Sequence, residues 1–367
     1  MLRHLFLGLF TIFVPISEGW AELTTPYTEA RESQYKKFFS ETLIPFWEKE
    51  TNRIIKSHDG KDLAYRWYAS QQSIEETKGN ILIVHGSSEM MPKYMETIWD
   101  LTQAGYNVSV YEQRGHGYSS RETSTKGMVH VPDFGFYIKD LSLVAAQLPY
   151  PELPRMLLTH STGGMAALGY IEEQPDTFAG AFMSSPMIKP KYPLATAIAE
   201  PILQAICYIN GDHAFSVSQG PPEPTPNTWN QDWAGTKSIP RFDQVEAYLV
   251  PAGYADIRIA GWSCGLWKTA VKYGKEITDD AAIAKIKIPI VMAQAGEDTY
   301  VNTEEQEALC KRLNQCRLIK FDDARHDIYM GRDKNRTRWM TEVISFFDKL
   351  ALEAKAKAPA KQAENKD

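Results

Sequence analysis

The chain has 367 residues, of which 43% are hydrophobic and 11% aromatic, so it can bury a sizeable core as one large domain or two. This composition excludes a disordered or collagen-like protein. The formal net charge is −6, and Lys and Arg are scattered rather than clustered. We therefore expect no nucleic-acid partner, because the basic surface that binds phosphates is missing.

The first 21 residues have the pattern of a secretory signal peptide. A charged start at Arg3 precedes an apolar run over residues 5–15, and Gly19 and Ala21 place small residues two apart. A membrane anchor is the alternative, but the run is shorter than the ~20 residues that a bilayer-spanning helix needs. We expect cleavage after Ala21 and export to the periplasm or beyond, with the mature chain soluble or attached to a membrane surface.

From about residue 62 the chain alternates short β-rich runs with helix-like stretches, an order that predicts a mainly parallel sheet with crossover helices. The expected strands are Leu63–Ala69, Asn80–Val84, Asn107–Tyr111, Met156–Thr159, Phe178–Met183, Ile288–Ala293 and Arg317–Phe321. The expected helices are Met91–Ala104, Asp133–Leu148, Thr162–Glu173 and Thr303–Leu313.

This order divides the chain into a core with an insertion. The core is expected over residues 22–185 and 288–350, and residues 186–287 are expected to form an inserted, mostly helical cap, because a loop of that length is not structureless inside a compact domain. Residues 351–367 are mostly Ala, Lys, Glu and Gln, which predicts a disordered tail.

One apolar stripe stands out within the expected cap. Leu194, Ile198, Ile202 and Ile206 follow one another at four-residue spacing, which places them on one face of a helix. Such a face either packs into the core of the cap or lines a tunnel for an acyl chain.

Four cysteines, Cys207, Cys264, Cys310 and Cys316, suit a chain that enters an oxidising compartment. Cys310 and Cys316 flank the expected end of a helix and the start of a strand, so their Cα atoms can approach the ~6 Å that a disulfide requires. The pairing of Cys207 with Cys264 and four buried thiols both stay open. There is no Cys-x-x-Cys, and the 8 histidines include no i, i+4 pair, so we expect no metal.

The strongest local motif is an apolar strand followed by Ser161 and the pair Gly163–Gly164, just before an expected helix. This is the context of a nucleophile elbow, a strained turn that exposes a serine between a strand and a helix. Thr159 stands where this motif usually has glycine. An ordinary strand-to-helix turn is the alternative, so the motif needs partners elsewhere in the chain.

Partners follow in the chain order of the α/β-hydrolase fold, which is serine, then acid, then histidine, each on a loop after a strand. Asp298 follows one expected strand and His326 follows the next, so we predict this fold with Ser161, Asp298 and His326 as a catalytic triad. In that triad the imidazole takes the serine proton and the carboxylate orients the imidazole. Glu297 and Asp323 are alternative acids.

Four further residues belong to this expected centre. An oxyanion needs two backbone N–H donors, one after the nucleophile and one after the strand that ends near His85, which points to Thr162 and Ser87. His160 is expected to pack beneath the elbow. His116 is expected to serve its own loop rather than to transfer protons. No cofactor is needed, because acyl transfer through serine requires only proton transfer and oxyanion stabilisation.

These motifs resemble those of bacterial lysophospholipases, in the branch of α/β hydrolases that also contains monoglyceride lipases and serine aminopeptidases. The resemblance covers Arg53 to Leu350. Its carriers are His85–Glu89 with Lys93–Tyr94, Gln113–Ser119, the elbow, Gly296–Asp298 with Val301, Arg325–His326 and the cap segments Ser218–Pro221 and Gly261–Trp267. The resemblance implies an α/β-hydrolase fold with helices on both faces of the sheet, and substrate contacts from Glu89, Trp262 and Trp267.

The resemblance also implies the reaction, which is hydrolysis of the acyl ester of a lysophospholipid to a free fatty acid and a glycerophosphodiester, with peripheral contact with membrane lipid. A monoacylglycerol lipase or a broad carboxylesterase is the alternative within enzymes. An aminopeptidase is a third, which needs an acid, Glu89 or one in the cap, to hold the substrate ammonium. A catalytically silent lipid carrier with this fold is a fourth.

Overall fold

The computed structural model describes residues 30–364 except for 218, 222–225 and 250–256, so the expected signal peptide lies outside the described residues. The α-helices are α1 (Tyr35–Phe38), α2 (Ile44–Trp47), α3 (Met95–Gln103), α4 (Gly135–Ala145), α5 (Thr162–Glu173), α6 (Thr196–Asn210), α7 (Ile239–Leu249), α8 (Cys264–Glu276), α9 (Asp280–Ile283), α10 (Thr303–Arg312) and α11 (Asp333–Glu364). The strands are β1 (Arg53–Lys56), β2 (Asp62–Tyr68), β3 (Gly79–Val84), β4 (Tyr106–Tyr111), β5 (Met128–Val129), β6 (Arg155–His160), β7 (Gly180–Ser184), β8 (Gly261–Trp262), β9 (Ile290–Ala295) and β10 (Cys316–Phe321).

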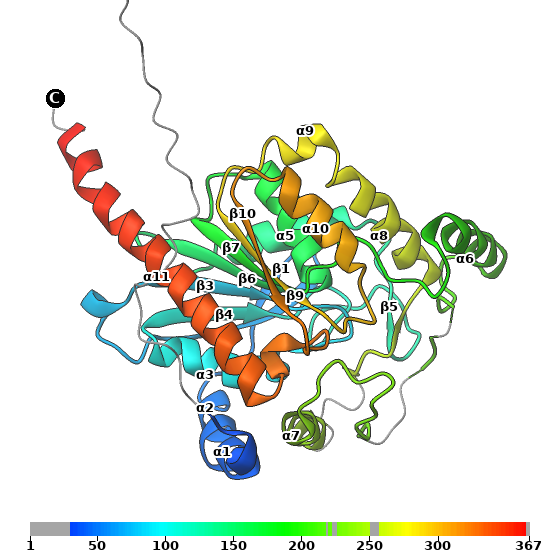
Figure 1. Ribbon diagram of the computed structural model, residues 1–367, viewed down its shortest axis with the longest axis horizontal. Helices are drawn as coiled ribbons and strands as arrows, with labels where there is room; N and C mark the ends of the chain where they lie inside the picture. The colour runs from blue at the N-terminus through cyan, green and yellow to red at the C-terminus, as the bar shows by residue number, and fades with distance from the viewer. Residues whose placement is uncertain (1–29, 218, 222–225, 250–256, 365–367) are drawn as a thin grey trace, which may run out of the picture.

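Eight of these strands form one sheet in the order β1-β2-β4-β3-β6-β7-β9-β10 (Figure 1). The pairs β1/β2 and β2/β4 are antiparallel, and the pairs from β4 to β10 are parallel. All seven strands expected from the sequence are present in this sheet. The mainly parallel sheet is therefore confirmed, and β1, a short and mostly exposed edge strand, is an addition to it.

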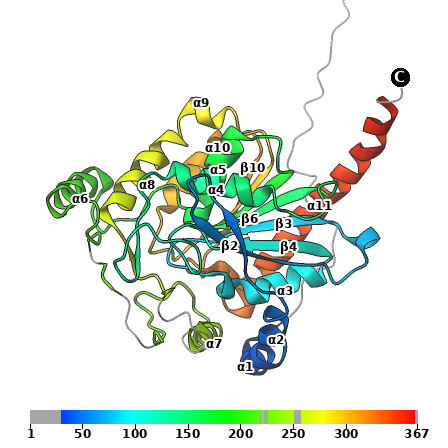
Figure 2. The ribbon, with the colours of Figure 1, turned by 180° about the vertical axis from the view of Figure 1, so that it is seen from behind.

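The sheet is covered on both faces, as the strands themselves require. All six residues of β3 are buried, and alternate residues join different cores. Ile81 and Ile83 pack in a core with α3 and α11, whereas Leu82 and Val84 pack in a core with α4, α5 and α10 (Figures 1 and 2). Parallel strands buried on both sides are typical of α/β folds. The α/β fold with helices on both faces is confirmed.

The segment between β7 and β9 carries α6 to α9 and β8, so helices are the main regular structure of the described part of the expected cap, although they cover less than half of its residues. It is joined to the core at several places, and Val245 and Leu249 of α7 pack in the same core as α3 and α11. β8 pairs with β5, and Leu266 and Ala270 of α8 pack in the same core as α4 and α5. The exact bounds of the cap, 186 and 287, stay a prediction.

Both disulfides that the sequence left open are present. Cys207 and Cys264 join α6 to the start of α8, with Cα atoms 5.1 Å apart. Cys310 and Cys316 join α10 to β10, with Cα atoms 5.3 Å apart. The second pair confirms the expected turn from helix to strand, and the first fastens α6 to the rest of the cap.

The apolar stripe of α6 has neither of the two expected roles. Leu194 and Ile198 are both 55% exposed and Ile202 is 49% exposed, so the stripe faces solvent. The helix turns its opposite side inward, where Cys207 is buried against Cys264 and Trp267. Four-residue spacing shows that a face is apolar but not which way it points, and here the inward side is the one that carries the disulfide.

The expected disordered tail is wrong over most of its length, since α11 continues to Glu364. Trp339, Val343 and Phe346 fix the first turns of α11 against the sheet. Ala, Lys, Glu and Gln are strong helix formers, and extending an existing helix avoids the cost of nucleation. Among the described residues, no helix has the length and apolar character needed to cross a bilayer.

Candidate active site

Ser161 occupies a strained turn between β6 and α5. Its backbone has φ 50° and ψ −122°, a combination that residues with a side chain rarely adopt. Three hydrogen bonds hold this backbone. Ser161 N donates to Ser184 O at 3.2 Å, and Gly164 N and Met187 N donate to Ser161 O at 2.9 and 2.8 Å. The geometry is that of a nucleophile elbow rather than an ordinary turn.

Gly163 allows α5 to begin this close to the sheet. A Cβ atom at this position would lie 2.2 Å from Val84 O at the end of β3. No side chain fits there, so the first turn of α5 lies directly against the loop that follows β3. That loop contains Ser87, the other expected source of an oxyanion donor.

His326 is bonded to Asp298 across the loops that follow β10 and β9. His326 Nδ1 lies 2.7 Å from Asp298 Oδ2, and both side chains are almost fully enclosed. The two alternative acids are engaged on the surface, Glu297 with Lys237 and Asp323 with Lys334. Of the three candidate acids, the structure therefore brings Asp298 to the histidine.

Several contacts hold the His326 loop against the elbow. Ser185 Oγ donates to His326 O at 2.8 Å, and the rings of His160 and His326 have centroids 4.6 Å apart. His160 is the residue before Ser161, so the expectation that it packs beneath the elbow agrees with this contact. Because Nδ1 of His326 is bonded to Asp298, Nε2 is the nitrogen left to exchange a proton with a hydroxyl group.

The charges of this pair are set by their surroundings. Burial opposes ionisation of Asp298, but His326 and the N–H groups of Tyr300 and Val301 hold its pKa below the ordinary value. Burial also lowers the pKa of His326, but the Asp298 carboxylate outweighs it, so the pKa is raised above 6.5. The pair therefore favours the protonated imidazole that a general base must form during the reaction.

The two expected oxyanion donors lie at the ends of adjoining segments. Thr162 is the first residue of α5, where backbone N–H groups have no acceptor within the helix. Ser87 is in the loop after β3, and its neighbour Ser88, with φ 59°, donates its N–H to His116 Nε2 at 3.3 Å. Burial lowers the pKa of His116, which suits an acceptor nitrogen. His116 thus supports a loop, as expected, and the loop is the one that holds Ser87.

The three expected substrate contacts have different surroundings. Trp262 is half-buried and its Nε1 donates to Ser87 Oγ, so it lies at the expected oxyanion loop. Trp267 packs inside the cap against the disulfide of Cys207 and Cys264. Glu89 is only 3% exposed and its carboxylate is enclosed by hydrogen-bond donors. Only Trp262 has surroundings that fit a substrate contact.

Two enclosed residues near His326 were not identified from the sequence. Tyr329 OH donates to Glu89 at 2.6 Å, and Asp327 accepts from Lys93 at 3.3 Å. Their position just after His326 was the only sequence signal. It gave no indication of function, because both bonds join residues more than 200 positions apart.

One buried group has the residue types of a metal site. His160, His326 and Asp327 offer ligand atoms within 4.8 Å of one another. Each side chain already has a polar partner, since His326 is bonded to Asp298, His160 to Glu89 and Asp327 to Lys93. These bonds explain the cluster without an ion.

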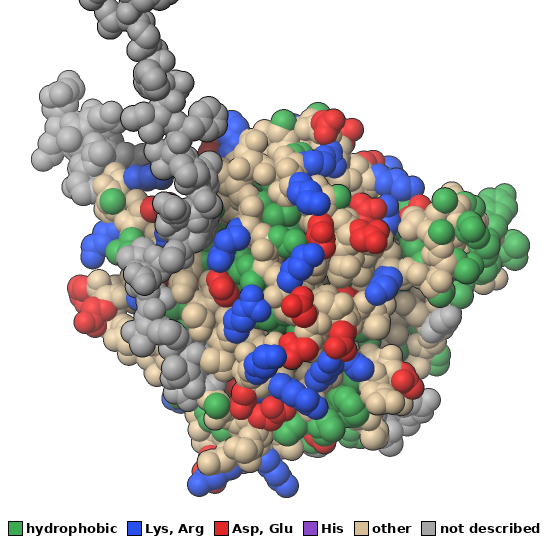
Figure 3. Space-filling model, in the orientation of Figure 1, with side chains coloured by type: hydrophobic (Ala, Val, Ile, Leu, Met, Phe, Trp, Pro, Cys, Tyr) green, Lys and Arg blue, Asp and Glu red, His purple; other side chains and the backbone are tan. Residues whose placement is uncertain are grey.

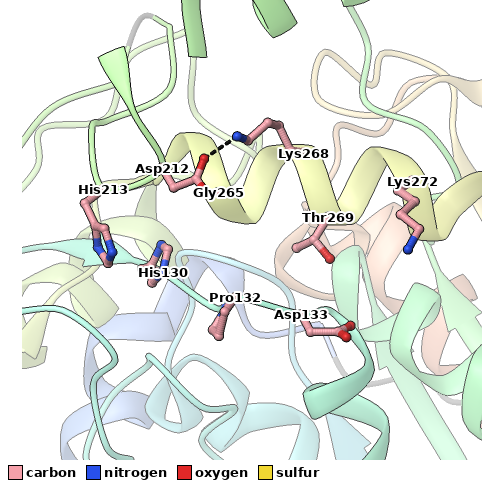
Figure 4. Close-up of a pocket in the computed structure, with 9 residues that line it drawn as sticks. All are labelled: His130, Pro132, Asp133, Asp212, His213, Gly265, Lys268, Thr269 and Lys272. Carbon is pink, nitrogen blue, oxygen red and sulfur yellow. Dashed lines mark ion pairs between the residues drawn. The ribbon is translucent and has the colours of Figure 1, made fainter. Parts of the chain in front are cut away.

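A cavity of about 440 Å³ lies between the cap and the segment around β5 (Figure 4). Figure 4 shows the rings of His130 and His213 together, 4.2 Å apart, and an ion pair between Asp212 and Lys268. Burial and the neighbouring His213 lower the pKa of His130. None of the lining residues belongs to the expected triad or oxyanion loop, so this cavity is separate from the candidate active site.

Comparison with known proteins shows to which family the chain is similar. Residues 75–333 match the family described as serine aminopeptidase, S33. A probable lysophospholipase L2 of Haemophilus influenzae is 25% identical over 326 residues, covering 87% of this chain and 98% of its own. A monoglyceride lipase of Rattus norvegicus is 31% identical over 132 residues, covering 35% of this chain and 41% of its own.

The fold is also found among solved structures. A soluble variant of monoglyceride lipase from Saccharomyces cerevisiae, in complex with a substrate analog, superposes with a TM-score of 0.65 at 17% identity. The match covers 82% of this chain and 96% of that one. At this identity the likeness concerns the fold alone, and it places the present sheet and its helices among the α/β hydrolases.

The His326–Asp298 pair predicts a specific dependence on pH. A general base must be neutral, so kcat/KM for an ester falls as pH drops through the pKa of His326, with a midpoint above 6.5. Asp298→Asn removes the carboxylate that raises this pKa, so the midpoint shifts to lower pH and turnover falls on the order of 10³–10⁴-fold. Steady-state kinetics between pH 4 and about 9 measure both.

Glu297→Gln is the matched control, because it removes the adjacent carboxylate, which pairs with Lys237 on the surface. We expect the Glu297→Gln protein to have the same turnover, and the same midpoint in the pH dependence of kcat/KM, as the unaltered protein. If Glu297→Gln lost activity and Asp298→Asn kept it, the assignment of the acid would be wrong.

Proposed function

Because the chain belongs to the serine aminopeptidase S33 family, we propose that it is a serine hydrolase that cleaves the acyl ester of a lysophospholipid. The observation that carries the proposal is the strained Ser161 elbow beside a histidine bonded to Asp298. Monoacylglycerol hydrolysis or a broader carboxylesterase activity is the alternative. A silent lipid carrier would not need this strained serine or the buried ion pair beside it.

The proposed mechanism uses Ser161, the buried pair of His326 and Asp298, and two backbone N–H donors. Ser161 Oγ attacks the ester carbonyl while His326 Nε2 takes its proton, and Asp298 stabilises the imidazolium that forms. The N–H groups of Ser87 and Thr162 donate hydrogen bonds to the negatively charged oxygen of the tetrahedral intermediate. His326 then protonates the leaving alcohol, and water repeats the sequence on the acyl-enzyme to release the fatty acid and restore Ser161.

The relatives favour a lysophospholipid over other esters. The probable lysophospholipase L2 aligns over nearly its whole length, cap included, whereas the rat monoglyceride lipase aligns over about a third of this chain. An aminopeptidase needs a free carboxylate for the substrate ammonium. Glu89, one of the candidates for that role, is enclosed by donors from the protein itself, so an aminopeptidase would have to use a carboxylate of the cap instead.

We further propose that α6 contacts the lipid surface that holds the substrate. The exposed apolar residues of this helix gather at one end of the molecule, where Figure 3 shows a cluster of hydrophobic side chains. They are Ile198, Ile202, Tyr208 and Ile209 of α6, with Leu194 just before the helix, and their exposed fractions run from 49% to 85%. Large exposed apolar patches mark sites of contact with partners or membranes. The disulfide of Cys207 and the ion pair of Glu200 with Lys275 fix the helix from its inner side.

We also propose that the mature protein is exported. The N-terminal pattern supports this, and so do the two disulfides, because disulfides persist in oxidising compartments and are rare in the cytosol. Cleavage is expected after Ala21.

The substrate assignment predicts that the purified mature protein hydrolyses lysophosphatidylcholine faster than monoolein, and an aminoacyl anilide not at all. Ser161→Ala abolishes ester hydrolysis, because the nucleophile is lost. The free energy of unfolding changes by no more than about 1 kcal/mol, because only a hydroxyl group is removed. Fatty-acid release and circular dichroism measure the two effects. Appreciable hydrolysis by a folded Ser161→Ala protein would falsify the assignment.

The role of α6 predicts weaker binding to phospholipid vesicles when Ile198, Ile202 and Ile209 are all changed to Ser. Partial insertion of three isoleucines contributes at least ~2 kcal/mol, so the partition coefficient falls at least about tenfold in co-sedimentation. Hydrolysis of a soluble short-chain ester stays the same. Ile54→Ser, on the edge strand β1 and 51% exposed, is the control and keeps full binding. Unchanged binding of the triple variant would contradict the proposal.

The location predicts that protein recovered from the envelope of expressing bacteria begins at Glu22. Mass spectrometry of the intact protein identifies this N-terminus. A chain that retains Met1 and stays in the cytoplasm would refute export.

A further inference from the structure

One buried carboxylate, that of Glu89, receives five hydrogen bonds. Its Oε2 accepts from Gly86 N at 2.6 Å, Tyr94 OH at 2.7 Å and His160 Nδ1 at 3.0 Å, and its Oε1 accepts from Lys93 Nζ at 2.8 Å and Tyr329 OH at 2.6 Å. Glu89 is 3% exposed. A carboxylate offers about four lone-pair positions, so its capacity to accept is filled.

Three of these donors come from the three segments that build the candidate active site, and the other two, Lys93 and Tyr94, come from the helical turn that follows Glu89. Gly86 precedes Ser87 in the oxyanion loop, His160 precedes Ser161, and Tyr329 follows His326 by three residues. His160 also reaches the third segment directly, since its Nε2 lies 3.3 Å from His326 O. A single carboxylate therefore connects the oxyanion loop, the elbow and the histidine loop.

The oxyanion loop has little room to shift over this carboxylate. A Cβ atom at Gly86 would lie 2.9 Å from both His160 Nδ1 and Ser161 Cβ, and 3.0 Å from Glu89 Oε2. The backbone at Gly86 thus rests on the elbow and on Glu89 at once. The bond from Gly86 N to Oε2 fixes the peptide that leads into Ser87.

We propose that Glu89 is a positioning residue, which fixes the N–H of Ser87 and the loops of Ser161 and His326 relative to one another for the reaction. This inference rests on the proposed ester hydrolysis. An oxyanion donor is effective only when its direction is fixed in advance. A shift of ~1 Å in such a group costs on the order of 10²-fold in rate.

The role requires a carboxylate rather than an amide. All five partners are donors, and glutamine in this place would turn its NH₂ group toward at least one of them. Burial raises the pKa of Glu89, but His160 and Lys93 outweigh it and hold the pKa well below the ordinary value. Burial and the charge of Glu89 raise the pKa of Tyr94 and of Tyr329 well above 10.0, so both keep the proton that they donate.

The test compares Glu89→Gln with Tyr329→Phe, which removes one donor from the same carboxylate but leaves the bond to Gly86. For hydrolysis of lysophosphatidylcholine, Glu89→Gln lowers kcat on the order of 10²-fold, the effect of disturbing one oxyanion donor, while KM stays within about threefold. Tyr329→Phe lowers kcat less than about tenfold. Thermal unfolding of both variants shows whether stability accounts for the difference.

Glu89→Asp replaces the glutamine variant if that variant does not fold. The aspartate keeps the charge, but its side chain is one methylene shorter, so the carboxylate lies further from Gly86 N. A tenfold or larger loss of kcat at constant KM in the folded Asp variant supports the inference. A rise in KM with unchanged kcat, or full activity in either folded variant, would overturn it. If the unaltered protein does not hydrolyse the ester, the proposed function fails instead, so the two failures are distinguishable.

Discussion

The backbone of Ser161 is the constraint on which the rest of the site depends. A residue with a side chain at φ 50° and ψ −122° stores strain of ~1–3 kcal/mol, which persists only where the surroundings allow nothing else. Here the surroundings are the strand β6, buried in all but its first residue, the helix α5 and the contact of Gly163 with the end of β3. The fold thus supplies the free energy that keeps the serine on a sharp turn at the carboxyl edge of the sheet.

The same edge gathers the other polar groups. In a parallel sheet, the loops after the strands gather at one edge, so Asp298 after β9 and His326 after β10 lie on the same edge as Ser161 after β6, and the ring of His326 contacts that of His160 beside the serine. The buried carboxylates at this edge are surrounded by hydrogen-bond donors. Asp298 receives two backbone N–H groups and the imidazole, and Glu89 receives five donors below the elbow. Compensation of this kind lets a buried site keep charged groups at fixed places, ready for charge that forms during the reaction.

The sequence predicted the features that depend on residues adjacent in the chain. It missed the features that depend on contacts between distant residues. The expected helix Thr162–Glu173 coincides with α5, because the strand, the serine and the glycines are adjacent in sequence. Chain order placed the acid after the strand that precedes Asp298 but could not by itself exclude the adjacent Glu297, and the hydrogen bond to His326 identifies Asp298. The inward side of α6 is bonded through Cys207 to Cys264, 57 positions further along the chain, and Glu89 is enclosed in part by Tyr329, so neither could be inferred from neighbouring residues.

The central claim is that the serine at this strained turn is the nucleophile. The most direct measurement is to treat the folded protein with a fluorophosphonate and to locate the covalent adduct by peptide mass spectrometry. We expect one adduct, on Ser161, whose formation slows as pH falls through the pKa of His326. No adduct, or an adduct on another residue, would contradict it.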